Sequence, residues 1–233
     1  MQRKIQVLGV ELDNCSAKEA MKTVVEGLRE ERMNVVEMVS MNTLAKFQQL
    51  DEAVNMFEAF DLVLPSDKGI LQAAEIEDER RLKEVDQMVF IKMVMRYLQK
   101  NQVRVFLLSE TEESRQQLEQ YIEEEYGNLK IVQSMSLEDK GSSDDMILNY
   151  VNGAEVECVL STIPSPVEEH FVFRNQSIIN ARIWLGFGAL LRDINREKKG
   201  IQKIRELISR HILKKEVELH KKKTDIVNND ISQ

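Results

Sequence analysis

Short apolar segments alternate along this chain with segments that have helical periodicity. Strands are expected at residues 4–10, 34–40, 62–64, 103–108, 129–133, 155–160 and 178–185, and a helical segment follows each of them. Residues 103–108 are almost wholly apolar, as in a strand that is buried on both faces of its sheet. A repeated order of strand and helix favours parallel strands with helices over both faces. We therefore predict an α/β fold, a mostly parallel sheet with helices on both faces, for residues 1–190.

The end of the chain differs from the rest in charge. Residues 192–223 hold twelve Lys or Arg and five Asp or Glu, a net charge of +7, so the remaining residues carry −15. This asymmetry indicates an anionic partner for the basic end alone, and the acidic body argues against nucleic-acid binding. Apolar residues recur there at helical spacing. We predict a basic amphipathic helical appendage at 191–223 and a disordered tail at 224–233.

The segment from Phe60 to Leu71 joins a short buried strand to a helix. Pro65 ends the strand because proline has no N–H to donate to a neighbouring strand. Ser66 or Asp67 can cap the helix that follows. Ligands of α/β sheets bind at the carboxyl ends of strands, and a helix N-terminus favours anions such as phosphate. The segment therefore indicates either an anion site or a capped junction that binds nothing.

The motifs of common cofactor and metal sites are absent from the sequence. It contains no G-x-x-x-x-G-K-[ST], no G-x-G-x-x-G after the first strand, and no H-E-x-x-H, paired C-x-x-C or D-x-D. Two cysteines make neither a disulfide framework nor a metal cluster. The first strand follows the N-terminus without a signal segment, so a reducing cytoplasm is the expected compartment. We expect no cofactor and no metal ion.

Several short segments follow one another in an order that a known family shares. They are V-L-G-V at 7–10, S-A-K-E-A at 16–20, V-S-M-N at 39–42, F-D-L-V-L-P-S-D-K-G at 60–69, V-F-L-L at 105–108, P-V-E-E-H-F at 166–171 and L-G-F-G at 185–188. Arg81 and Asp86 also keep the family's spacing. Together these positions resemble the WecB/TagA/CpsF family of bacterial glycosyltransferases over residues 4–210.

The resemblance implies a Rossmann-like fold and a metal-independent sugar transfer. Members of that family move N-acetylmannosamine, its uronic acid or a related sugar from a UDP donor to a lipid-linked sugar, in cell-surface polysaccharide or teichoic acid synthesis. Members of that family also form trimers, and they have a basic C-terminal appendage that contacts the membrane. For this chain the resemblance implies a UDP-sugar, a polyprenyl-linked acceptor and a peripheral position at the inner face of the cell membrane.

The resemblance also assigns binding residues, one position at a time. Ser40 takes the position of a family Thr, and Asn42 takes that of a family Asn. The expected substrate-binding residues are Asn42, Arg81, Asp86, Glu168, Glu169 and Arg210, of which Arg210 belongs to the appendage.

The catalytic position departs from the family. Where the family has its catalytic Asp this chain has Ser66, with Asp67 one residue later. A serine hydroxyl cannot serve unaided as a base near neutral pH, so Asp67 or Glu168 would have to replace it. The catalytic candidates are therefore Ser66, Asp67 and Ser40.

Further departures leave two functions open. S-E-T-E-E at 109–113 replaces a glycine-rich turn, and P-S-P at 164–166 removes another glycine. Glu168 replaces a family Gln beside Glu169, and two carboxylates facing a UDP diphosphate would repel it. One hypothesis is an active transferase with a rearranged site. The other is a catalytically degenerate relative that binds or assembles with an active glycosyltransferase, as a homo-oligomer or a mixed oligomer.

The expected pocket lies between residues 40–42, 66–69 and 164–169, because these follow strand carboxyl ends. Each assignment has a simpler alternative: helix capping for Asn42 and Ser66, and a surface ion pair for Arg81. Residues 192–223 either contact an anionic membrane surface or pack on protein.

Overall fold

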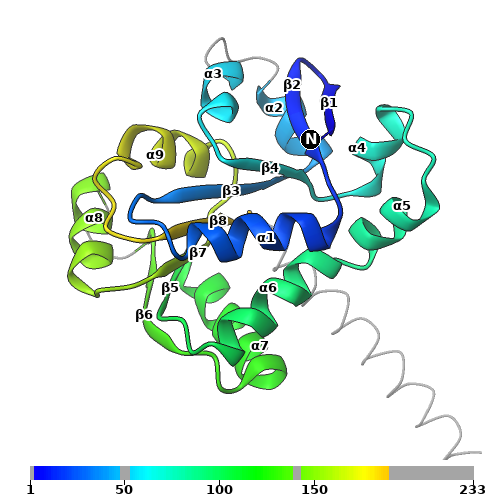
Figure 1. Cartoon of the computed structure of the whole chain (residues 1–233). Helices are drawn as coiled ribbons and strands as arrows, with labels where there is room; N and C mark the ends of the chain where they lie inside the picture. The colour runs from blue at the N-terminus through cyan, green and yellow to red at the C-terminus, as the bar shows by residue number, and fades with distance from the viewer. Residues whose placement is uncertain (1–2, 48–52, 139–142, 189–233) are drawn as a thin grey trace, which may run out of the picture. The chain divides into compact units, whose positions relative to one another are not determined.

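The computed structural model describes residues 3–47, 53–138 and 143–188. Its centre is a six-stranded sheet in which every neighbouring pair is parallel. The strands run in the order β4-β3-β8-β7-β5-β6 (Figure 1). Their bounds are β3 Asn34–Val39, β4 Leu62–Pro65, β5 Val105–Ser109, β6 Ile131–Ser136, β7 Cys158–Thr162 and β8 Ile183–Gly186. The predicted parallel α/β sheet is confirmed.

Helices cover both faces of this sheet. They are α1 Ala17–Gly27, α2 Met41–Phe47, α3 Ala53–Glu58, α4 Lys68–Ala73, α5 Glu79–Asp86, α6 Val89–Lys100, α7 Glu112–Tyr126, α8 Asp144–Gly153 and α9 Val167–Asn175. Alternate strand residues such as Val35 and Trp184 form one core with Phe47 of α2, Ile147 of α8 and Phe171 of α9. Helices α1 and α6 pack against each other on the other face. Because both faces are covered, strands such as β5 are buried along their whole length.

The chain begins with an antiparallel hairpin that is separate from the parallel sheet. Strand β1 Arg3–Val7 pairs with β2 Val10–Asn14, and Leu8 and Gly9 turn the chain with positive φ angles of 50° and 84°. The prediction of one strand at 4–10 is therefore wrong at its end, because a turn of this kind is favoured where glycine relieves the strain of positive φ. The Asp13 carboxylate accepts a hydrogen bond from the Val63 amide at 2.9 Å, so the hairpin covers the β4 edge.

Helix α5 was not expected from the sequence. It begins at Glu79, and Asp78 caps it through the Arg80 amide at 2.9 Å. Ion pairs of Arg80 with Glu84 and of Lys83 with Glu79 then follow helical spacing. Asp86 is the last residue of this helix.

The capping pattern at the start of α1 is present as expected. The Ser16 hydroxyl accepts the Glu19 amide at 3.3 Å, and the Glu19 carboxylate accepts the Ser16 amide at 2.8 Å. The predicted appendage at 191–223 and the tail at 224–233 lie outside the described residues. Among the residues that are described, no helix is both long and apolar enough to cross a membrane.

Candidate functional site

Three loops meet at the carboxyl edge of the sheet, where the sequence predicts the pocket. The loop between β4 and α4 contacts the start of α2, because the Asp67 carboxylate accepts the Met41 amide at 2.9 Å. The loop between β7 and α9 reaches the same helix, because the Ser165 and Thr43 hydroxyl oxygens are joined by a hydrogen bond at 3.2 Å. The Lys46 ammonium also donates to the Ser165 carbonyl at 3.0 Å. The expected loops are therefore neighbours that hydrogen bonds hold together.

Asp67 and Ser66 have different environments within this edge. Asp67 caps α4 by accepting the Ile70 amide at 3.2 Å, in addition to the Met41 amide. Ser66 is buried, and its amide donates to the Val39 carbonyl at 2.8 Å. Between the two candidates for the cap, the structure selects Asp67. The Asp67 carboxylate uses two of its roughly four acceptor positions in this way, so it can still accept a proton from a ligand.

Ser40 and Asn42 also differ from each other in their contacts and in their exposure to solvent. The Ser40 hydroxyl accepts the Thr43 amide at 3.0 Å and contacts the Thr43 hydroxyl at 3.0 Å, so Ser40 caps α2. Asn42 lies in the first turn of α2 and is exposed. Asn42 is thus the more accessible of the two for a ligand at this edge.

Arg81 lies on α5 in a half-buried ion pair. Its guanidinium donates to the Glu84 carboxylate at 2.8 Å and to the Asn14 side chain at 3.4 Å. Only 14% of the Arg81 side chain and 15% of the Glu84 side chain are exposed. Glu84 also accepts the Ala17 amide at 3.0 Å. The expected alternative of a surface pair gives the correct type of interaction, but the pair is largely shielded from water.

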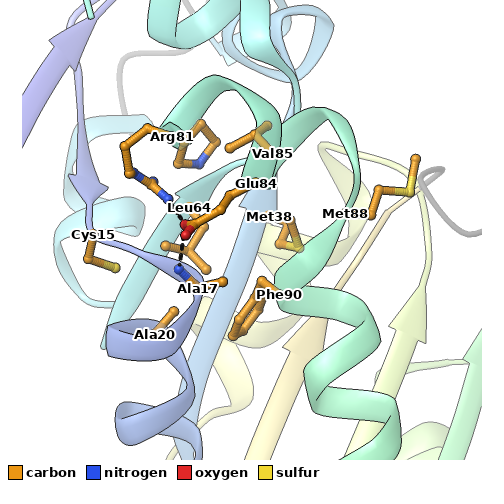
Figure 2. Close-up of a pocket in the computed structure, with 11 residues that line it drawn as sticks. Cys15, Ala17, Ala20, Met38, Leu64, Arg81, Glu84, Val85, Met88 and Phe90 are labelled. Carbon is orange, nitrogen blue, oxygen red and sulfur yellow. Dashed lines mark hydrogen bonds and ion pairs between the residues drawn. The ribbon is translucent and has the colours of Figure 1, made fainter. Parts of the chain in front are cut away.

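A cleft lies beside this ion pair, and Figure 2 shows the residues around it. It is small, with about 30 Å³ of room for water-sized molecules, and the wider space around it includes open solvent. The apolar part of its lining comes from α1, the ends of β3 and β4, and the start of α6: Ala17, Ala20, Met38, Leu64, Pro65 and Phe90. In Figure 2 the Arg81 and Glu84 side chains meet above this apolar group. A ligand here would have an apolar floor and, at the rim, the ion pair of Arg81 with Glu84.

The Glu84 carboxyl stays ionised in this place. Burial opposes its charge, but the Ala17 amide and the Arg81 guanidinium outweigh burial and lower the pKa of Glu84 below its ordinary value. Asp86, the last residue of α5, is exposed, and its carboxylate forms an ion pair with the Lys68 ammonium at 3.0 Å. The structure therefore places Arg81 at the cleft and Asp86 on the surface.

Glu168 and Glu169 lie inside the fold, in the first turn of α9. Their exposed fractions are 1% and 0%, and Glu37 on β3, with 1%, is the third carboxyl of the group. Burial and the charge of Glu169 raise the pKa of Glu168 to about 8. Burial and the charges of Glu168 and Glu169 raise the pKa of Glu37 well above its ordinary range. These carboxyls do not face an open cleft, so they do not present two exposed charges to a diphosphate.

Glu37 was missed by reasoning from the sequence. Its signal was a single acidic residue within the apolar strand segment 34–40. Strand β3 pairs Glu37 with Gly186 on β8, so a carboxyl can lie where the neighbouring strand has no side chain. Perturbed carboxyls of this kind gather at functional sites as well as in structural networks.

The start of α7 stands where the resemblance predicts a glycine-rich turn, and a carboxylate of the chain itself lies at its amides. Thr111 caps the helix, because its hydroxyl accepts the Ser114 amide at 3.0 Å. The Glu138 carboxylate accepts the Glu112 amide at 3.0 Å. The side chains therefore satisfy helix amides that a phosphate would otherwise approach.

The expected binding residue Arg210 lies outside the described ranges. Within residues 3–47, 53–138 and 143–188, no group of three or more His, Cys, Asp or Glu side chains is arranged to hold a metal ion.

Comparison with protein families identifies a match over most of the chain. A model of the glycosyl transferase WecG/TagA/CpsF family matches residues 5–199, which is the family that the quoted segments resemble. No curated protein matches the chain.

Proposed function

Because this chain belongs to the WecG/TagA/CpsF glycosyl transferase family, we propose that it transfers an N-acetylhexosamine of the N-acetylmannosamine type from a UDP-sugar to a polyprenyl-linked acceptor. Members of the family act in the synthesis of cell-surface polysaccharides. The observation that carries the proposal is the position of Arg81, which lies at the rim of a cleft beside the ends of β3 and β4. Ligands of α/β sheets bind at this edge.

In the proposed reaction, the anomeric carbon is attacked by a hydroxyl of the acceptor. The new C–O bond forms as the bond to the diphosphate breaks, UDP leaves with the electron pair, and a base accepts the hydroxyl proton. Asp67 is the better candidate for this base, because Glu168 is buried and the Asp67 carboxylate keeps free acceptor positions. Arg81 would offset the charge of the diphosphate, and Asn42 would hold the donor from the first turn of α2.

Calorimetric titration with UDP and UDP-N-acetylmannosamine tests the binding step. Arg81→Met should weaken binding at least tenfold, because a charged hydrogen bond to phosphate is lost. Its matched control is Arg80→Met, which changes the exposed neighbour on the same helix. Absence of heat from the wild type at millimolar ligand would contradict the proposal.

A transfer assay with the lipid-linked acceptor tests the base. Asp67→Asn keeps a good helix cap, so the fold should persist while the rate falls about 10²-fold or more. Asp145→Asn, on the exposed side of α8, is the control and should leave the rate unchanged. An Asp67→Asn variant with the rate of the wild type would exclude Asp67 as the base.

The second candidate function is a non-catalytic partner of an active glycosyltransferase. It is favoured by Ser66 at the catalytic position and by the Glu138 carboxylate on the Glu112 amide. Under this hypothesis the chain forms a homo-oligomer or a mixed oligomer with an active paralogue. Light scattering after size exclusion, with the chain alone and co-expressed with such a paralogue, separates the two functions. A monomer in both settings would exclude the partner role.

The proposal also places the protein at the inner face of the cell membrane, through residues 192–223. Their charge supports contact with an anionic surface, where each basic residue contributes about 1 kcal/mol. The full chain should float with phosphatidylglycerol vesicles at low salt, and a chain cut after Leu191 should not. Equal flotation of both chains would exclude this contact.

A further inference from the structure

Three carboxyl groups share one buried volume between the sheet and the first turn of α9. Glu37 comes from β3, and Glu168 and Glu169 come from α9. No more than 1% of any of them is exposed. Carboxyl groups are almost never buried this completely unless they are paired, so the group needs a physical account.

The backbone of β8 provides the space for Glu37. Gly186 stands beside Glu37 on β3 and beside Ser161 on β7 in the parallel register. A Cβ atom at residue 186 would lie only 1.9 Å from a carboxyl oxygen of Glu37. The Glu37 carboxyl therefore rests directly over the β8 backbone, on the face that carries α9.

Neutral donors satisfy only part of the group. The Trp184 indole donates to Glu168 at 2.9 Å, and the Ser161 hydroxyl and the Gly188 amide also favour its charged form. The Ser165 hydroxyl donates to Glu169 at 2.5 Å. One oxygen of each carboxyl, Oε2 in all three, has no hydrogen-bond partner among the residues that the structure describes.

Positive charge near the group is small. Lys46 of α2 and His170 of α9 act on Glu169. Lys46 is exposed and His170 is half-buried, while the groups acting on Glu37 are two further carboxyls. Three buried negative charges without a buried cation would repel one another strongly, and protonation is the usual relief.

We propose that Glu37, Glu168 and Glu169 retain at least one shared proton in the folded protein. This proton stabilises the packing of the first turn of α9 against the sheet. A proton on one carboxyl supplies a donor for an unpartnered oxygen of the group. Its loss leaves the carboxylates of β3 and α9 repelling each other, against the apolar packing of the same elements. The Ser165 hydroxyl bonds to both Glu169 and Thr43, so loosening α9 also loosens the loops of the candidate site. This inference holds whether or not the chain transfers a sugar.

The pH range follows from the direction of the pKa shifts. All three carboxyls have raised pKa values, with burial as the main cause, so the folded state binds more protons than the unfolded state. The stabilisation is complete below the ordinary glutamate pKa of about 4.5, and it is lost as the pH rises toward about 8, the pKa of Glu168. The protein should therefore become less stable across the neutral range as the pH increases.

The test measures unfolding by denaturant at a series of pH values from about 5 to about 8.5. The slope of unfolding free energy with pH gives the number of protons taken up on folding. For the wild type we expect about one proton or more near pH 7. Glu37→Gln combined with Glu168→Gln should remove most of this uptake, because the amides do not titrate and Glu169 then has no carboxyl neighbour in the group. Glu123→Gln on the exposed face of α7 is the control and should leave the slope unchanged.

Infrared absorption of the wild type provides a second readout that does not depend on how a variant folds. A protonated-carboxyl stretching band should persist at pH 7 and disappear on unfolding. Glu37→Gln, if folded, should reduce this band. Equal pH slopes in the wild type and in the folded double variant, or a folded wild type without the band at pH 7, would overturn the proposal.

Discussion

Glu84 and Glu168 are two carboxyls that are shielded from water, but the pKa of Glu84 is lowered and the pKa of Glu168 is raised. Glu84, beside α1, is held by the Arg81 guanidinium and the Ala17 amide, and its pKa is lowered. Glu168, beneath α9, receives hydrogen bonds from neutral donors and faces Glu169, and burial with that charge raises its pKa to about 8. Burial alone therefore does not decide the charge of a carboxyl. A nearby cation keeps Glu84 ionised, and a nearby carboxyl favours a proton on Glu168.

The largest effect should come from filling the space beside Glu37. Gly186→Ala places a methyl group in the volume of the Glu37 carboxyl and should lower the free energy of unfolding by about 3 kcal/mol or more. Gly153→Ala is the control, because nothing lies within 4 Å of its added Cβ, and it should be neutral or slightly stabilising. Chemical denaturation measures both.

A double variant checks the cause of this loss. Glu37→Ala combined with Gly186→Ala removes the carboxyl that the methyl group would meet, so part of the stability should return. If the loss of unfolding free energy in the double variant equals the sum of the losses in the single variants, the two positions are energetically independent, which would contradict the contact.

An intermediate effect should come from Glu84, whose carboxylate is paired with the Arg81 guanidinium. Glu84→Gln weakens the bonds to Arg81 and Ala17 and should cost about 1–2 kcal/mol at pH 7. Because the pKa of Glu84 is lowered on folding, its contribution is present above the ordinary value of 4.5 and is lost as the pH falls. Denaturation at pH 7 and pH 4 should therefore show a smaller cost at pH 4.

Glu79→Gln is the matched control for Glu84→Gln. It changes an exposed pair with Lys83 on the same helix and should cost no more than about 0.5 kcal/mol. A cost for Glu84→Gln as small as this would mean that the two pairs are equally weak.

The smallest effect should come from Lys46, whose charge acts on Glu169. Lys46→Met removes a charge that favours the ionised form of Glu169, so the stability near pH 8 should fall by about 0.5 kcal/mol and change less near pH 5. Lys92→Met, on the exposed face of α6, is the control. The same loss at both pH values would indicate lost packing or the lost bond to Ser165 instead of lost charge.

Segments with strong periodicity were predicted well, and segments with mixed signals were not. Residues 103–108 could be recognised as a buried strand because a continuous apolar run has few alternatives in an α/β chain. The hairpin at Leu8 and Gly9 was missed because the strand pattern continues across the turn. Helix α5 was missed because its charges, which pair along the helix, resemble those of a solvated loop.

The sequence by itself determined the alternation of strands and helices, the family, and the residue types at the candidate site. Local side chains dictate these features through burial and capping, as Ser16 and Thr111 show. The tertiary structure alone decided which acids meet. Glu37 and Glu168 are far apart in the sequence, and they become neighbours because β3 lies next to β8 and α9 packs above both. Arg81 likewise meets Asn14 only because α5 folds back on the end of β2, whereas its pair with Glu84 follows from helical spacing. The charge of a carboxyl depends on groups within a few ångströms, and those groups are fixed by packing rather than by order along the chain.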